Sequence, residues 1–259
     1  MGWRSFVAMG DSFTEGMDDA YPDGTYRGWA DLVAARLAVE NGPDFGYANL
    51  AIRGRLLDQV VAEQVEPALA MEPDLVSFAA GGNDVLRRKA DPAALIERID
   101  PVIGRIRATG ADVILFRFAD VASQLPGQRL VGPRAAVLND GARRLADKHG
   151  AYLIDLHDDH TFHNPLMWST DRLHLSAGGH RRVAGHVLRA LGVEVDEEWL
   201  LAPPMPAPAP WLTARSADLR WAGQYLAPWL KRRLTGASSG DLVRAKRPSL
   251  APVQTVEKG

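Results

Sequence analysis

Cysteine is absent from this chain of 259 residues, and no apolar run approaches the length needed to cross a bilayer. Without cysteine the protein has no disulfide, no thiol nucleophile and no cysteine-ligated zinc or iron–sulfur site. The formal net charge is only −2 at pH 7, so no global field favours binding to nucleic acid or to an anionic membrane. We therefore expect no nucleic-acid partner.

We expect no secretory leader, because the first four residues lead straight into an apolar run with no basic region or cleavage site before it. We therefore expect a cytoplasmic location. Hydrophobic residues make up 46% of the chain and charged residues 24%. These proportions are typical of a globular protein that buries a full hydrophobic core.

Five apolar segments with strand character alternate with five segments of helical periodicity. The predicted strands cover 5–8, 45–51, 74–80, 112–118 and 151–156, and the predicted helices cover 27–40, 56–71, 91–109, 133–149 and 176–191. Such alternation implies parallel strands joined by right-handed crossovers, with helices on both faces of the sheet. The pattern predicts an α/β fold, a three-layer α/β/α sandwich around a five-stranded, mostly parallel, flavodoxin-like sheet. Pro67, late in the second helix, is expected to end or kink it.

A tight turn, Gly10-Asp11-Ser12, follows the first predicted strand and precedes polar, helix-starting residues. In open α/β folds the carboxyl edge of the sheet is where ligands bind. The backbone N–H groups at the start of the following helix suit an oxyanion. Ser12 is therefore a candidate nucleophile. The alternative, which this turn alone leaves open, is that Ser12 is an ordinary N-cap residue.

Three further polar blocks follow in order along the chain. Gly54 comes after the second strand, Gly81-Gly82-Asn83-Asp84 after the third, and Asp171-Arg172-Leu173-His174 before the last helix. With the Gly10-Asp11-Ser12 turn, these blocks in this order resemble the SGNH hydrolases, also called GDSL-type esterases and lipases. The resemblance spans residues 5–190 and implies an SGNH-type hydrolase domain over 1–195.

The resemblance implies a catalytic triad. Ser12 would be the nucleophile, His174 the base that takes its proton, and Asp171 the carboxylate that holds the imidazole in one tautomer. An alternative for Asp171 and His174 is that they belong to a capped helix start.

The resemblance also implies an oxyanion hole. Its donors would be the backbone N–H of Ser12, the backbone N–H of Gly54 and the side-chain amide of Asn83. A plain turn glycine and an Asx turn are the alternatives for the last two. Asp11 and Asp84 are expected to cap and order these loops rather than to take part in the chemistry.

The implied activity is hydrolysis of a carboxylic ester, with a small-acyl or lipid-acyl group, through an acyl-enzyme intermediate. It requires a small-molecule ester as partner, no cofactor and no metal. Two other hypotheses remain. In the first, the chain would be a catalytically silent ligand-binding module of the same fold. In the second, it would be a membrane-peripheral protein that uses a basic aromatic helix near its C-terminus.

Two polar clusters outside these blocks have plainer interpretations. One loop combines histidines with aspartates in a way that resembles a metal site, but its irregular spacing favours a solvated loop. Four arginines flank the second and third blocks, and a solvated role is favoured over a positive rim for an anionic substrate. His180 is expected to be structural. The loop residues are His157, Asp158, Asp159, His160 and His163, and the arginines are Arg53, Arg55, Arg87 and Arg88.

The composition changes at residue 196. Residues 196–212 are rich in proline and predict an extended linker. Residues 213–259 predict a C-terminal helical extension, with aromatic residues at helical spacing, followed by a loose tail. Packing back over the preceding domain is the simplest role for this extension. A dimer contact is a second role, and a membrane contact is a third that is not favoured. The sequence does not determine the oligomeric state.

Overall fold

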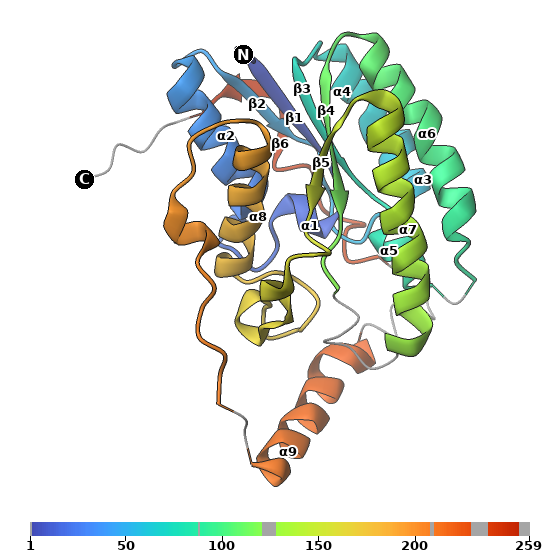
Figure 1. Ribbon diagram of the computed structural model, residues 1–259, viewed down its shortest axis with the longest axis vertical. Coiled ribbons are helices and arrows are strands. Elements are labelled where there is room, and N and C mark those ends of the chain that lie inside the picture. The colour runs from blue at the N-terminus through green and yellow to red at the C-terminus, as the bar shows by residue number, and fades with distance from the viewer. Residues whose placement is uncertain (1, 88, 121–127, 208–209, 229–237, 254–259) are drawn as a thin grey trace.

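The computed structural model describes residues 2–87, 89–120, 128–207, 210–228 and 238–253 (Figure 1). Strands and helices alternate from the N-terminus to α8. The strands are β1 (Ser5–Gly10), β2 (Gly46–Asn49), β3 (Leu75–Ala79), β4 (Asp112–Arg117), β5 (Tyr152–Asp155) and β6 (Arg247–Pro252). The helices are α1 (Ser12–Glu15), α2 (Gly28–Asn41), α3 (Leu57–Val60), α4 (Glu66–Ala70), α5 (Gly82–Val85), α6 (Pro92–Ala108), α7 (Gln128–His149), α8 (Ala177–Ala190) and α9 (Trp211–Trp221).

The sheet has the order β5-β4-β3-β1-β2-β6, and its first five strands in sequence pair in parallel. The direction in which strands are added reverses between β1 and β3. Such a switch point opens a crevice outside the carboxyl ends of the two strands. The turns after β1 and β3 carry Ser12 and Asn83, so the topology alone brings these two side chains to one edge.

Helices cover both faces of the sheet and confirm the predicted three layers (Figure 1). The side chains of β1 show why. Phe6 and Ala8 lie in the hydrophobic cluster beneath α2 and α8, whereas Val7 and Met9 lie in the cluster beneath α3, α4, α6 and α7. Alternate residues of a strand point to opposite faces, so a continuous apolar run is what a strand buried on both faces requires.

Pro67 does not end its helix, so the first of the two predicted effects is wrong. The segment passes from α3 through a π-helical turn, Val61–Val65, and continues as α4 to Ala70. Proline has no N–H and its ring crowds the carbonyl four residues earlier. The wider π turn directly before Pro67 accommodates both effects and lets the chain stay helical.

The sheet has six strands rather than the predicted five. The sixth, β6, lies within the segment predicted as a loose tail and pairs antiparallel with β2. Its sequence, Arg-Pro-Ser-Leu-Ala-Pro, gives little strand signal because it holds two prolines. Proline is nevertheless tolerated on an edge strand, and β6 covers an edge of β2 that would otherwise expose unpaired backbone groups.

A partly buried lysine fixes β6 to the body of the protein. Lys246 Nζ lies 2.9 Å from Asp31 Oδ1 on α2 and donates to the carbonyl oxygens of Tyr26 (3.1 Å) and Arg27 (2.6 Å). Tyr47 donates to the same Asp31 oxygen at 2.6 Å. Burial lowers the pKa of Lys246, while the charge of Asp31 opposes that effect.

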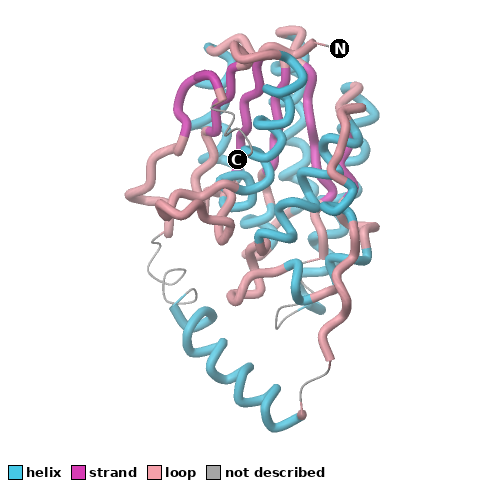
Figure 2. Tube along the Cα trace, turned by 90° about the vertical axis from the view of Figure 1, so that its left-hand side faces the viewer, coloured by secondary structure: helices cyan, strands magenta, loops and turns pink. Residues whose placement is uncertain are grey.

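The C-terminal segment also carries α9, which lies beyond the carboxyl edge of the sheet (Figures 1 and 2). Helical structure continues from α9 through a π-helical turn, Ala222–Leu226, to residue 228. Residues 229–237 of the predicted extension lie outside the described residues. None of the helices in the described ranges combines the length and the apolarity that a membrane span needs.

Lys246→Met tests whether this anchor stabilises the fold. The substitution leaves Asp31 as an uncompensated charge with only 14% of its side chain exposed, so we expect the free energy of unfolding to fall by about 3 kcal/mol. Lys148→Met is the matched control, because Lys148 pairs with Asp100 at the surface and an exposed pair contributes at most about 1 kcal/mol. Urea unfolding measures both. Equal losses for the two variants would contradict a structural role for Lys246.

Candidate active site

Ser12 lies at the first position of α1, and Asp11 before it is the N-cap. The Asp11 carboxylate accepts a hydrogen bond from the backbone N–H of Phe13 at 3.1 Å. The capping role that was the alternative for Ser12 therefore belongs to its neighbour. Ser176 shows what a capping serine does in this chain, because its Oγ accepts from the backbone N–H of Gly179 at 3.2 Å.

The turn that carries Ser12 is held by a buried amide. Gln64, on the π-helical turn, donates to the carbonyl oxygen of Gly10 at 2.9 Å and accepts from its N–H at 2.8 Å. Only glycine fits at position 10. Its φ is +154°, and a Cβ there would lie 2.6 Å from the carbonyl oxygen of Ala79. Both constraints fix where the first strand ends, and therefore the position of Ser12.

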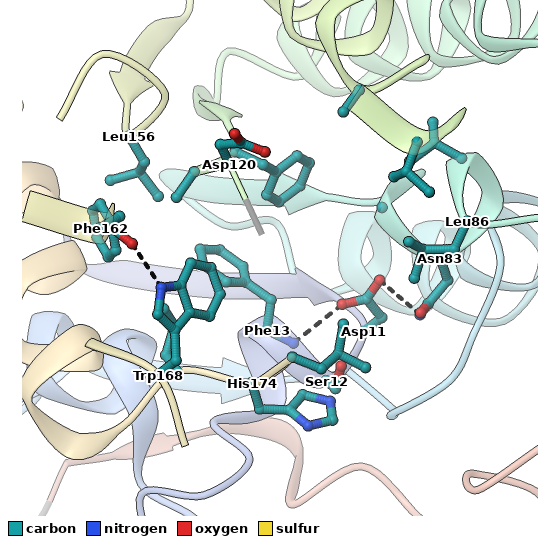
Figure 3. Close-up of a pocket in the computed structure, with 18 of the residues that line it drawn as sticks. Asp11, Ser12, Phe13, Asn83, Leu86, Asp120, Leu156, Phe162, Trp168 and His174 are labelled. Atoms are coloured by element: carbon teal, nitrogen blue, oxygen red, sulfur yellow. Dashed lines mark hydrogen bonds between the residues drawn. The ribbon is translucent and has the colours of Figure 1, made fainter. Parts of the chain in front are cut away.

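The structure brings Asp171 and His174 together in one turn. Asp171 Oδ2 lies 2.5 Å from His174 Nδ1, while Oδ1 accepts from the backbone N–H groups of Leu173 and His174 at 2.9 Å each. A carboxylate beside Nδ1 assigns the proton to that nitrogen and leaves Nε2 as the basic one. Ser12 and His174 line the same pocket, where Figure 3 shows them next to each other.

The protonation states of Asp171 and His174 depend on the groups that contact them. Burial alone raises the pKa of Asp171, but its bonds to His174 and to the backbone outweigh burial and lower that pKa to about 2. Burial likewise favours the neutral imidazole, yet Asp171, Asp18 and Asp11 together raise the pKa of His174 above 6.5. Asp171 is therefore ionised at any ordinary pH, and His174 becomes a free base as the pH rises through its elevated pKa.

Asp18 is a second carboxylate beside the histidine, and the sequence analysis did not identify it. Its Oδ2 lies 3.9 Å from His174 Nδ1. Ser169 links the two acids, because its Oγ lies 2.5 Å from Asp18 Oδ2 and 3.2 Å from Asp171 Oδ1. Asp18 has a φ of +66°, a conformation that aspartate adopts more readily than most residues.

Asp18, Asp171 and His174 are also the one group of described residues whose ligand atoms lie within metal-binding reach of one another. The donor set is that of a weak site at most, because Nδ1 is already occupied by Asp171. The histidine-rich loop gives no such group among the described residues. Its Asp158 pairs with Arg117 at 2.8 Å, and its Asp159 pairs with Arg182 and His186.

The three predicted oxyanion donors differ in how they are engaged. Within the described part of the chain, the backbone N–H groups of Ser12 and Gly54 have no hydrogen-bond acceptor. Glycine suits position 54, because its φ is +73° and a Cβ there would lie 2.5 Å from Ser238 Oγ. Asn83 instead donates from Nδ2 to Asp11 Oδ2 (3.0 Å) and to the carbonyl oxygen of Arg55 (3.1 Å), as Figure 3 shows for Asp11. An oxyanion would therefore compete with the Asp11 carboxylate for this amide.

Burial raises the pKa of Asp11 to about 7, against the lowering effect of its bond to Phe13. Asp84 orders the neighbouring loop by accepting from the backbone N–H of Leu57 at 3.0 Å. The buried carboxylate of Glu15 accepts from the backbone N–H of Arg53 at 2.7 Å. This last bond ties the helix of Ser12 to the turn of Gly54, so two of the predicted oxyanion donors are fixed relative to each other.

The pocket around these groups has a mostly apolar wall (Figure 3). The wall comes from the ends of β4 and β5, from α5 and α7, and from the loop before α8. Its larger members are Val85, Leu86, Phe118, Leu138, Leu156, Phe162 and Trp168. Asp11 and Asn83 lie with Ser12 and His174 at one end of the pocket, whereas Asp120 lies across the cavity from them (Figure 3). The site therefore combines a polar corner with a mostly apolar cavity.

The remaining predicted residues lie in structural roles. His180 Nδ1 accepts from the backbone N–H of Trp29 at 3.2 Å, and Nε2 donates to the carbonyl oxygen of Met17 at 2.9 Å. Burial lowers the pKa of His180 to about 4, so it is neutral at pH 7. Arg53 pairs with Glu15, and Arg55 pairs with Glu63. These pairs remove two of the four cations from the hypothetical positive rim, while Arg88 lies outside the described residues.

The sequence did not point to Asp18 because that residue lies in a loop rich in aspartate and glycine, with no motif around it. Leu138 and Phe118 lie within segments that the sequence analysis predicts as a helix and a strand. An apolar residue that lines a pocket has the same sequence pattern as one that fills a core. Only the long-range placement of α7 against β4 distinguishes the two.

Comparison with known proteins gave one family and a set of structural neighbours. The sequence model of the GDSL-like lipase/acylhydrolase family matches residues 8–182. A search of curated proteins gave no match. Among solved structures, TesA is 26% identical with a TM-score of 0.59, over 72% of this chain and 97% of TesA.

Two other neighbours share the fold. LAE5, described as an alpha/beta hydrolase enzyme from the metagenome of Lake Arreo in Spain, is 24% identical with a TM-score of 0.60, over 73% of this chain and 94% of LAE5. Axe2, an acetylxylan esterase from Geobacillus stearothermophilus, is 21% identical with a TM-score of 0.58, over 77% of this chain and 97% of Axe2.

Asp18→Asn tests whether the second carboxylate acts on the histidine. Removing a negative charge 3.9 Å from Nδ1 disfavours the imidazolium, so the pKa of His174 falls and the free base persists to lower pH. We expect the acidic limb of the pH profile of ester hydrolysis to move to lower pH. Asp100→Asn, which removes the charge beside the remote His149, is the control. An unchanged acidic limb in Asp18→Asn would contradict the electrostatic role.

Proposed function

Because this chain belongs to the GDSL-like lipase/acylhydrolase family, we propose that it is a serine hydrolase that cleaves carboxylic esters through an acyl-enzyme intermediate. The observation that carries the proposal is that His174, which lines the same pocket as Ser12, lies 2.5 Å from the Asp171 carboxylate through its Nδ1. Family membership supports ester hydrolysis in general. The residue roles, the intermediate and the substrate described below are our own inference.

In the first step the Ser12 Oγ attacks the ester carbonyl carbon while His174 Nε2 takes the hydroxyl proton. The tetrahedral intermediate collapses, the bond to the alcohol breaks, and His174 returns the proton to the leaving oxygen. A water molecule then gives its proton to His174 and attacks the acyl carbon. The acid leaves, and Ser12 regains its proton. Asp171 stays ionised throughout and orients the ring, because its pKa is about 2.

The negative charge that develops on the carbonyl oxygen needs donors. The backbone N–H groups of Ser12 and Gly54 supply two, since neither has another acceptor in the described part of the chain. Asn83 supplies the third when its amide turns from Asp11 to the oxyanion. The competing group is the buried Asp11 carboxyl, whose pKa is about 7. Below that pH the carboxyl is protonated and accepts the Asn83 hydrogen bond less strongly, which favours the turn of the amide to the oxyanion.

The apolar cavity accommodates the acyl group in this proposal. Its volume is about 130 Å³, and an apolar cavity of ~150 Å³ holds a benzene ring. The match favours an acyl chain of roughly six carbon atoms over acetate, because a short acyl group would leave apolar wall in contact with water. The alcohol part then lies on the side of the polar groups.

The two rival hypotheses receive less support. A silent binding module has no use for a histidine held by two carboxylates beside a serine. A membrane role for the aromatic helix is weakened by Trp221, whose side chain is buried against the catalytic turn and is therefore not available to a lipid surface.

Ser12→Ala tests the nucleophile. Removal of the hydroxyl abolishes the acyl-enzyme route, and we expect hydrolysis of p-nitrophenyl hexanoate to fall at least ~1,000-fold. Ser176→Ala is the matched control, because it removes a serine hydroxyl that caps α8 and costs only about 1 kcal/mol of stability. Residual activity of Ser12→Ala close to that of Ser176→Ala would exclude Ser12 as the nucleophile.

Leu138→Ala tests the acyl pocket. Leu138 and Phe118 separate the pocket from a smaller apolar void beneath α6 and α7, because both residues line both spaces. Shortening Leu138 joins the two, so the preferred p-nitrophenyl ester should shift to a longer chain, with a stability loss of about 2–5 kcal/mol. Leu145→Ala enlarges only the inner void and should lose stability without a shift. The same chain-length optimum in both variants would contradict this assignment of the pocket.

A further inference from the structure

We propose that the described part of the C-terminal segment, residues 211–228 and 238–252, belongs to the catalytic apparatus, with Trp221 and Asp218 as positioning residues that hold the turn of Asp171 and His174. The inference rests on the proposed function, because it assigns that turn a catalytic role. The family match ends at residue 182, so the segment lies beyond the part of the chain that the family model describes.

Three contacts join the segment to the turn. The Trp221 indole Nε1 donates to the backbone carbonyl oxygen of Asp171 at 3.0 Å. Arg172, the next residue, pairs with Asp218 through an Nη1 to Oδ1 distance of 2.9 Å. Its guanidinium also lies over the Trp221 ring, 5.0 Å from the centroid. Trp221 and Asp218 are three residues apart and therefore share one face of α9.

A second aromatic residue extends the contact. Tyr225, on the π-helical turn after α9, has its hydroxyl 3.0 Å from Thr170 Oγ1. The three residues of the segment thus contact Thr170, Asp171 and Arg172 in succession. The exposed fractions of two tryptophans identify the face of α9 that contacts the Asp171 turn. Trp221 is 7% exposed, whereas Trp211 at the start of the same helix is 68% exposed.

The turn has a reason to need outside support. Arg172 has a φ of +60°. This left-handed conformation is unfavourable for an L-residue that carries a Cβ. The strained residue lies next to the carboxylate that orients His174. On the inner side Ser169 and Asp18 contact the turn, and on the outer side the C-terminal segment closes it. Strain of this kind persists only where the surroundings fix it.

The segment is itself held at both ends, so it can act as a fixed support. Before α9, Asn164 donates to the carbonyl oxygen of Pro203 at 3.0 Å. After α9, Lys246 pairs with Asp31 and β6 joins the sheet. Between these points, Ser238 lies so near Gly54 that a Cβ on the glycine would be 2.5 Å from its Oγ. The same segment therefore contacts both the Asp171 turn and the Gly54 turn.

The test is Trp221→Phe in the full-length chain, which keeps an aromatic ring and removes only the indole donor. Loosening the turn misplaces the base, and we expect kcat for p-nitrophenyl hexanoate to fall about 10- to 100-fold with little change in KM. Asp218→Asn, at a half-exposed position, should lower kcat in the same direction. Trp3→Phe is the matched control, because Trp3 is also buried and donates its indole N–H to a carboxylate, that of Asp112, far from the site.

A double-mutant cycle separates positioning from stability. If Trp221 acts through Asp171, its substitution should change kcat little in an Asp171→Asn background, whereas a structural effect would be the same in both backgrounds. Equal kcat values for Trp221→Phe, Trp3→Phe and wild type would overturn the inference while leaving the proposed function intact. A wild-type protein without Ser12-dependent hydrolysis would instead overturn the proposed function.

Discussion

The hydrogen bond between Asp171 and His174 is the interaction on which the rest of the site depends. At 2.5 Å it fixes the imidazole with Nε2 as the basic nitrogen, and it keeps a carboxylate ionised in a partly enclosed pocket. In the proposed mechanism Ser12 gives its proton to that nitrogen, and the Asp18 carboxylate lies 3.9 Å from the other nitrogen of the same ring. Both members of the pair lie in one turn of chain. Their geometry therefore depends on what holds that turn from outside.

The order of the strands in the sheet brings the Ser12 turn and the Asn83 turn to the same site as the Asp171 turn. Its strand order reverses between β1 and β3, which places the Ser12 turn and the Asn83 turn at the edges of one crevice. Buried polar side chains then fix each turn against the next. Gln64 holds Gly10, and Glu15 ties α1 to the turn of Gly54. A buried polar group that finds all its partners favours one arrangement, since any other leaves it unsatisfied.

The sequence was sufficient for the parallel strands and the three layers, and it singled out Ser12 and His174, which line one pocket, and Asp171, which contacts His174. Each of these follows from local periodicity or from a short block at a strand end. It was not sufficient for β6, whose two prolines weaken the strand signal, because an edge strand is selected by the neighbour that it covers. Asp18 and Trp221 were missed for a related reason. Their roles come from contacts across about 150 and 50 residues of chain, for which local patterns carry no information.

The most direct measurement is to treat the protein with a fluorophosphonate and locate the adduct by mass spectrometry of peptides. Such reagents label a serine only where a base activates it and an oxyanion hole receives the phosphoryl oxygen. We predict a single adduct on the peptide that contains Ser12, and its loss in His174→Ala. An adduct on another serine, or none in a folded wild-type protein, would contradict the proposal that Ser12, His174 and Asp171 form one catalytic unit.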